Sequence, residues 1–317
     1  MAATMGTPFI ALQEPAKLDG WVRGVSHDKQ PPDVVPAVFR DAMEVRESVF
    51  VNEQKVPLQY ELDADDPRSC HWVTYASVNW TTEPEVRDPE TGAIVRPRRS
   101  VTRSQPVATI RVVPFPHPPH PVNGGWYING ELQPPLPGQQ SQDQQQPGNT
   151  APSPAAAAAS PEAQPGHRRA STSMTPAPGL SYTIDRETQF HDGREPYVKV
   201  GRLAVVRQFR RLHMGAQVWR AARQWLATHP TYFNPSVAEM GMDRLGAAGA
   251  PPGEVPKWRG LVVAHAQESV APLWERWGFR RDHAMGRWFE EGIPHVGMVI
   301  RLDVEGGKNP PPLGGPA

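Results

Sequence analysis

The segment Val200–Trp219, VGRLAVVRQFRRLHMGAQVW, constrains the fold more than any other part of the chain. A β-branched, apolar run over 197–206 predicts a strand, and apolar residues spaced by three and four over 212–226 predict a helix directly after it. Free N–H groups at the start of that helix favour an anion. The turn adds two arginines as cationic donors, and Gly215 would let a ligand approach the backbone closely. The pattern predicts a diphosphate site, with an ordinary strand–helix corner as the alternative.

Other segments with clear periodicity indicate one mixed sheet with helices between its strands. The apolar residues of 35–50 predict an amphipathic helix with Pro36 in its first turn. A short helix is expected over 268–277, ended by Gly278. Further strands are predicted over 21–25, 71–78, 107–113, 261–264 and 296–302. This order of elements is typical of an α/β or α+β fold.

The 38 prolines of the chain are distributed unevenly and define its organisation. Residues 115–195 are rich in Pro, Gln and Ala, offer little apolar surface to offset chain entropy, and are expected to form a disordered insertion. A second flexible insertion is expected over 234–257 and a disordered tail over 304–317. The rest predicts a single domain over 18–303. Within the first insertion, residues 168–171 read Arg-Arg-Ala-Ser, a sequence that basophilic kinases accept.

Composition excludes several classes of partner and site. The chain has 33 basic and 33 acidic residues, so its formal net charge is zero and no nucleic-acid partner is expected. Its one cysteine, Cys70, rules out an intramolecular disulfide and a multi-cysteine zinc site, and no metal is predicted. The N-terminus lacks the features of a signal peptide, and no apolar run is long enough to span a membrane. We therefore expect a cytoplasmic or nuclear protein that does not bind membranes.

The central segment resembles motif A of the GCN5-related N-acetyltransferases, whose pattern is Gln/Arg-x-x-Gly-x-Gly/Ala. Arg210 matches the first position and Gly215 the last, whereas His213 stands where the family has a glycine. AHAQESVAPLWERWGF, over 264–279, resembles the later strand–helix motif of the same family. Two more segments, over 45–66 and 289–298, resemble the ElaA-like branch. The resemblance implies a mostly antiparallel sheet with helices on both faces and acetyl-CoA as co-substrate.

The same resemblance implies a set of cofactor-binding residues. The strand would offer backbone groups to the pantetheine arm, the turn and helix start would hold the diphosphate, and two residues of the later motif would complete the site. Trp274 occupies a position where the family often has a tyrosine that protonates the departing thiolate; tryptophan has no acidic hydroxyl, and a core aromatic is the alternative role. The implied set is Leu203, Ala204, Val205, Arg210, Arg211, Leu212, His213, Met214, Gly215, Ala216, Gln267 and Trp274.

Acyl transfer to an amine needs a base, because the ammonium form must lose a proton before it attacks. The candidate bases are Glu53, Glu61, Asp63, His71, Glu291 and His295. Glu53 and His295 are the preferred catalytic candidates, and Glu61 and His71 are assigned to substrate binding. For Asp65 and Asp66 a solvated acidic loop is the better interpretation. The acidic cluster as a whole predicts a cationic amine acceptor.

The sequence leaves three functional readings open. The first is an acetyl-CoA-dependent N-acetyltransferase that acts directly on an amine of a small molecule or peptide, without a cysteine nucleophile. The second is an amino-sugar N-acetyltransferase. The third is a non-catalytic acyl-CoA-binding or scaffold protein, favoured by His213 and Trp274, which depart from the catalytic pattern of the family. A homodimer is one of the oligomeric states left open.

Overall fold

The computed structural model describes residues 8–134, 184–236 and 254–304. Nine strands form one sheet in the order β1-β2-β5-β8-β9-β11-β10-β6-β7, and β3 and β4 form a separate hairpin. All neighbouring strands of the large sheet are antiparallel except the pairs β8–β9 and β10–β6. The protein therefore has a mixed α+β fold around a mostly antiparallel sheet, as expected.

The strands occupy the following ranges: β1 Phe9–Gln13, β2 Cys70–Glu83, β3 Val86–Arg87, β4 Ile94–Arg96, β5 Arg99–Val113, β6 Trp126–Ile128, β7 Glu131–Leu132, β8 Val198–Val205, β9 Leu261–Gln267, β10 Arg280–Glu290 and β11 Ile293–Arg301. The helices are α1 Ala37–Arg46, α2 Met214–Thr228 and α4 Ala271–Arg276. Short turns of helix are η1 His27–Lys29, η2 Glu47–Glu53, η3 Leu58–Tyr60, η4 Asp66–Arg68, η5 Arg207–Phe209 and η7 Glu268–Val270.

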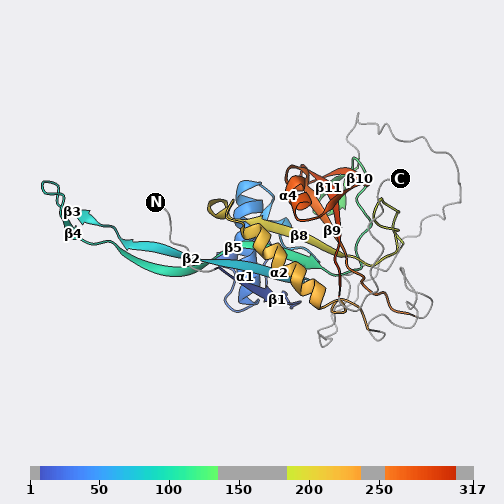
Figure 1. Ribbon diagram of the computed structural model, residues 1–317, viewed down its shortest axis with the longest axis horizontal. Helices are drawn as coiled ribbons and strands as arrows, with labels where there is room; N and C mark the ends of the chain where they lie inside the picture. The colour runs from blue at the N-terminus through green and yellow to red at the C-terminus, as the bar shows by residue number, and fades with distance from the viewer. Residues whose placement is uncertain (1–7, 135–183, 237–253, 305–317) are drawn as a thin grey trace, which may run out of the picture.

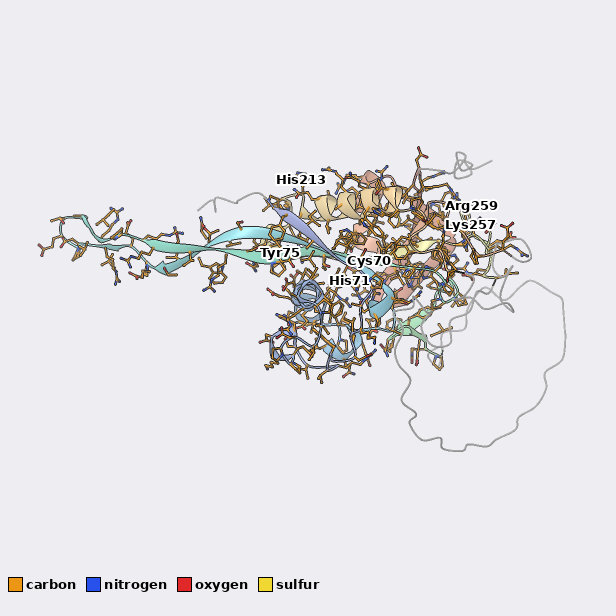
Figure 2. The ribbon with its side chains drawn as sticks, turned by 90° about the horizontal axis from the view of Figure 1, so that it is seen from below. Cys70, His71, Tyr75, His213, Lys257 and Arg259 are labelled. Atoms are coloured by element: carbon orange, nitrogen blue, oxygen red, sulfur yellow. The ribbon has the colours of Figure 1, made fainter. Side chains whose placement is uncertain are left out.

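Helices α1 and α2 cover opposite faces of the sheet (Figure 2). Successive residues of a strand point to opposite faces, and β2 shows the division. Val73 packs with Ala42 of α1, whereas Trp72 meets Trp225 of α2 with ring centroids 5.5 Å apart. Alternate residues of β2 therefore pack against different helices, one set against α1 and the other against α2.

The strand predicted over 21–25 is wrong. The Gln30 side chain accepts a hydrogen bond from Val22 N–H and donates to the carbonyls of Val22 and Val25, so this segment satisfies its backbone groups without a neighbouring strand. Trp21 is buried and meets Phe39 edge to face. The sheet instead begins earlier, with β1, so the folded domain extends N-terminal to residue 18.

The predicted insertion over 115–195 is folded at both of its described ends. Residues 126–128 form β6, which pairs with β10, and Phe190 is buried in the core. His120 and His191 join the two ends through a ring-nitrogen contact of 3.0 Å. The expected disorder of the central part, including Ser171, concerns residues outside the described ranges, as does most of the 234–257 segment. Val304 is buried, so the predicted tail is folded at its first residue.

Strands β2 and β5 continue past the body of the molecule as a long arm that ends in β3 and β4 (Figure 1). The two strands pair from Cys70 to Glu83 on one side and from Arg99 to Val112 on the other. Both strands were predicted only in their inner, apolar halves. The outer halves alternate exposed polar residues with a few exposed apolar ones, such as Trp80.

Candidate functional site

Strands β8 and β9 run parallel and then stop pairing. Their register begins at Val198 opposite Val262 and ends at Val200 opposite Ala264, although β8 continues to Val205 and β9 to Gln267. From Gly201 onward, no strand among the described residues pairs with the β9-facing edge of β8. An unpaired strand edge offers N–H and C=O groups to whatever lies beside it.

A β-bulge in β8 lies at the point where the two strands separate. Thr109 and Arg111 of β5 oppose Ala204 and Gly201, so two residues of β8 face one residue of β5. Arg202, within the bulge, has a φ of 48°, in the left-handed region. Bulges bend a strand and increase its twist, which accounts for the departure of β8 from β9.

Helix α2 begins directly after β8 and a short basic turn. Arg211 and His213 in this turn both have positive φ values, 64° and 60°. Gln217 N–H donates to His213 C=O at 3.0 Å and forms the first hydrogen bond of the helix. The N–H groups of residues 214–216 precede that bond and point out of the helix end. A helix N-terminus of this kind favours an anion, so the start of α2 remains the candidate position for the predicted diphosphate.

The glycine at position 215 faces the space between β8 and the α4 region. A Cβ added there would lie 3.4 Å from Val205 Cγ2 and 3.6 Å from the ring of Trp277, so a small side chain would fit and a large one would not. Trp277 follows α4, and the sequence analysis did not single it out. Trp274, its neighbour by one turn, is buried and packs against Trp219 and Phe279 as a core aromatic.

Arg210, one of the predicted cofactor-binding residues, has hydrogen-bonding partners within the protein. Arg210 donates from Nε to Val205 C=O at 2.9 Å and forms a salt bridge with Glu53, whose Oε2 lies 2.8 Å from the guanidinium. Both side chains are partly exposed. Arg207 and Arg211 are exposed and form no salt bridge with any other residue that the structure describes. The turn therefore keeps an excess of positive charge, and Glu53 fixes Arg210.

Gln267, the last residue of β9, meets Gln54 at the end of η2. The two amides donate to each other, at 2.8 Å from Gln267 and 3.2 Å from Gln54. This pair connects the segment after α1 to the end of β9, beyond the point where β9 stops pairing with β8. Gln54 was not among the predicted residues, because only the tertiary structure brings these two positions, 213 residues apart, into contact.

The acidic loop is an internal salt-bridge cluster rather than a solvated surface. Asp66 is buried and contacts Arg46 at 2.8 Å and Arg111 at 2.7 Å. Burial would raise the pKa of Asp66, but the two guanidinium groups outweigh it and hold the pKa well below its usual range. The solvated loop expected for Asp66 is therefore wrong. Asp65, which is partly buried, forms a salt bridge with Arg68.

Glu61 and His71, predicted to bind substrate, lie in the same cluster. Glu61 is 2% exposed and contacts Arg46 at 2.6 Å. Arg202 of the β8 bulge lies 2.9 Å from Asp63 and 3.3 Å from Glu61. His71 of β2 is buried, its ring meets that of Phe39 of α1 edge to face at 5.1 Å, and its burial lowers its pKa to about 4. Cys70 is a buried thiol, and burial raises its pKa.

The charges of this cluster balance internally. Four carboxylates pair with four guanidinium groups and leave no surplus negative charge; the eight residues are Glu61, Asp63, Asp65, Asp66, Arg46, Arg68, Arg111 and Arg202. The cationic acceptor predicted from the sequence therefore remains a prediction that these four carboxylates do not support. Glu291, another candidate base, sits in the β10–β11 turn and accepts a hydrogen bond from Asn129 N–H at 2.6 Å.

A second polar cluster lies on β9, β10 and β11. His295 of β11 is opposite both Gln267 and Trp288, and its Nδ1 lies 2.8 Å from Ile293 C=O. Glu290 of β10 accepts a hydrogen bond from Trp288 Nε1 at 2.8 Å. Its carboxylate also lies 3.4 Å from His265 Nδ1 and 3.9 Å from His295 Nε2.

His265 and Glu290 were not predicted as site residues. His265 lies between apolar residues of β9 and directly follows Ala264, the last residue of β9 that pairs with β8. The only sign in the sequence that His265 could have a functional role was that it is a polar residue within an otherwise apolar strand. Among the described residues, no group of three or more His, Cys, Asp or Glu side chains is arranged to hold a metal ion. None of the helices in the described ranges is long and apolar enough to cross a membrane.

Comparisons with known proteins give weak similarities. No family model matches the chain, and no curated protein matches it. Among solved structures, a putative N-acetyltransferase from Lactobacillus plantarum aligns with 94% of this chain and 99% of its own, at 13% identity and a TM-score of 0.39. Escherichia coli ElaA aligns with 92% and 99%, at 14% identity and a TM-score of 0.36.

An acyl-CoA N-acyltransferase from Pseudomonas aeruginosa aligns with 92% of this chain and 99% of its own, at 13% identity and a TM-score of 0.35. Scores at this level are too low to define a function for this chain. The geometry of β8, β9 and α2 therefore has to carry the functional argument.

Proposed function

We propose that this protein is an acyl-CoA-dependent N-acyltransferase that uses acetyl-CoA to acetylate an amine of a small molecule or peptide. The observation that carries the proposal is the divergence of the parallel strands β8 and β9, immediately followed by the N-terminus of α2. The resemblance of the same segment to motif A of the GCN5-related family supports it.

The residues present suit the chemistry of coenzyme A. The unpaired edge of β8 from Gly201 to Val205 offers hydrogen-bonding groups to a chain that carries amides, as the pantetheine arm does. The N–H groups of residues 214–216, together with Arg211, suit a diphosphate. A glycine at position 215 leaves room beside that helix end. Bound there, acetyl-CoA would supply a thioester carbonyl activated for attack by an amine.

The remaining contacts support structural roles for two other predicted residues, Glu53 and Trp274. Glu53 holds Arg210, which in turn holds the carbonyl of Val205, so these residues shape the turn that leads into α2. Trp274 stabilises the core under α4 and has no hydroxyl to donate. The departing thiolate would then take its proton from solvent or from the amine itself.

Substitution of the glycine near the α2 N-terminus tests the proposal. In Gly215→Glu, the longer side chain meets Val205 and Trp277 and places a negative charge at the helix end, so acetyl-CoA binding measured by calorimetry should fall at least tenfold. Gln224→Glu adds the same charge at an exposed position two turns further along α2 and should bind normally.

Two results would contradict the proposal or narrow it. Equal acetyl-CoA affinity for the two variants would place the cofactor elsewhere. Tight binding by the wild-type chain, without thiol release in the presence of spermidine, L-lysine, glucosamine or trialanine, would favour the non-catalytic acyl-CoA-binding alternative.

A further inference from the structure

We infer that His265 is the group that accepts the proton of the acceptor amine, and that Glu290 positions it. This inference rests on the proposed function and names a residue for its chemistry. It starts from the location of His265, which is the first residue of β9 beyond the last β8–β9 pair. The next residue of β8, Gly201, no longer pairs with β9, so His265 lies where the two strands begin to separate.

The two ring nitrogens of His265 differ in their surroundings. Nδ1 lies 3.4 Å from the Oε1 atom of Glu290. Nε2 is buried and has no hydrogen-bond partner within the described part of the protein. A carboxylate beside Nδ1 favours the tautomer with the proton on that nitrogen, which leaves the lone pair of Nε2 free. A buried acceptor without a donor costs free energy, so this nitrogen is suited to a donor brought by a ligand.

Glu290 is itself held in place. Trp288 is fully buried, donates from Nε1 to Glu290 Oε1 at 2.8 Å, and meets the His265 ring edge to face at 4.9 Å. The carboxylate therefore cannot turn away from His265 without losing its hydrogen bond to Trp288. Carboxylate, imidazole and free Nε2 form the arrangement that general-base catalysis requires.

Five charged or titratable groups face the His265 ring from the packed elements: Glu290 of β10, His295 of β11, Lys199 of β8, and His117 and His120 after β5. Burial lowers the pKa of His265, and Lys199 and His295 lower it further, whereas Glu290 raises it. The net pKa lies below 6.5, so the ring is neutral and able to accept a proton at pH 7.

The proton transfers then balance. His265 Nε2 takes one proton from the ammonium group, and the freed amine lone pair forms a bond to the acyl carbon. The carbon–sulfur bond breaks with its electron pair on sulfur. The second amine proton goes to the thiolate, giving the free thiol, and His265 returns its proton to solvent.

The test compares His265→Gln with His283→Gln, an exposed histidine of β10. With spermidine, L-lysine, glucosamine and trialanine as acceptors, His265→Gln should lower kcat by about 10²–10⁴-fold and abolish the acidic limb of the kcat/KM profile. Acetyl-CoA affinity by calorimetry should change less than about threefold, since the residue acts on the amine.

The role of Glu290 is tested separately. Glu290→Gln should move the acidic limb of the kcat/KM profile to lower pH, because the carboxylate raises the pKa of His265. Glu290→Asp keeps a carboxylate and should return the limb part of the way to its wild-type pH.

Nuclear magnetic resonance of ¹⁵N-histidine-labelled wild-type protein decides the point independently of turnover. The His265 ring should carry its proton on Nδ1 at pH 7, and its signals should shift on addition of acetyl-CoA, while those of His283 should not. A proton on Nε2, unshifted signals, or normal kcat in His265→Gln would overturn the inference. If acetyl-CoA does not bind the wild-type chain, the proposed function is wrong. In that case the tautomer of His265 still tests whether Glu290 contacts Nδ1.

Discussion

His213 shows why the family pattern has a glycine at this position. Its backbone lies in the left-handed region, with a φ of 60° and a ψ of 14°, directly before the first residue of α2. Side chains with a Cβ are disfavoured there, and histidine is among the residues that tolerate it better than most. A glycine at position 213 would adopt the same conformation without the cost of a Cβ.

Replacing this histidine should stabilise the protein slightly. His213→Gly removes the cost of a Cβ in the left-handed region, about 1–2 kcal/mol, and adds about 0.5–1 kcal/mol of chain entropy in the unfolded state. The free energy of unfolding by urea should rise by about 1 kcal/mol or less. His213→Ala keeps the Cβ and should not share the gain; an equal gain in both would show that the imidazole, and not the backbone, was unfavourable.

The arm formed by the outer halves of β2 and β5 is a separate structural element. One of its faces carries Trp80 opposite Val101, which are 53% and 45% exposed. The other face is polar, and the Thr102 hydroxyl donates to Asn79 Oδ1 at 2.6 Å. Two-stranded ribbons without a covering layer contribute little free energy of their own. The alternation of polar residues here explains why the apolar pattern predicted only the inner halves of the strands.

Shortening the arm should leave the domain intact. Replacing residues 80–101 with an Asn-Gly turn joins positions 79 and 102, which already face each other. Because the removed side chains are exposed, the free energy of unfolding should change by less than about 1 kcal/mol, and acetyl-CoA affinity should be unchanged. A larger loss in a urea melt, together with a change in mass by light scattering, would show that the arm is buried in an oligomer.

At the scale of the whole molecule, burial keeps several of the described histidines neutral, among them His71, His117, His120 and His265. Burial lowers the pKa of His71 to about 4 and of His120 to about 3, and holds that of His117 well below its ordinary value. The unfolded chain takes up protons at these positions below about pH 6.5, whereas the folded chain does not. Folded stability is therefore fully present above that pH and decreases as the pH falls.

The free energy of unfolding should fall by about 1 kcal/mol or more for each unit between pH 6.5 and pH 4. Below about pH 4 the decrease should steepen. Burial would raise the pKa of Asp63, but Arg111 and Arg202 outweigh it and lower the pKa to about 2, so the salt-bridge contribution of this carboxylate is lost there. Urea melts at several pH values measure the slope. His120→Asn should flatten it and His283→Asn should not, and a flat wild-type profile would contradict the argument.

Periodicity and turn chemistry gave the positions of the local elements. Helix α1, strand β8, helix α2 and strand β9 were predicted within a few residues, because each has an apolar pattern that its own chain segment must bury. The prediction of an anion site at the α2 N-terminus also came from the sequence alone, since it depends on a helix start and its neighbouring arginines. β10 was missed because charged residues interrupt its apolar pattern, and β1 was missed although its sequence, FIALQ, is almost entirely apolar.

Only the tertiary structure decided which polar residues meet. The acidic loop looked solvated in the sequence, yet Asp66 is buried because Arg46 and Arg111 reach it from two other elements. His265 and Glu290 come together because β9 and β10 both flank β11 in the sheet. A sequence determines hydrophobic periods over a few turns of chain, but the pairing of a charge or a lone pair depends on distances of a few ångströms between distant segments. Strand order and register fix those distances. In this protein they place Asp66 in a structural salt-bridge cluster and His265 beside Glu290, where it can act as the proposed base.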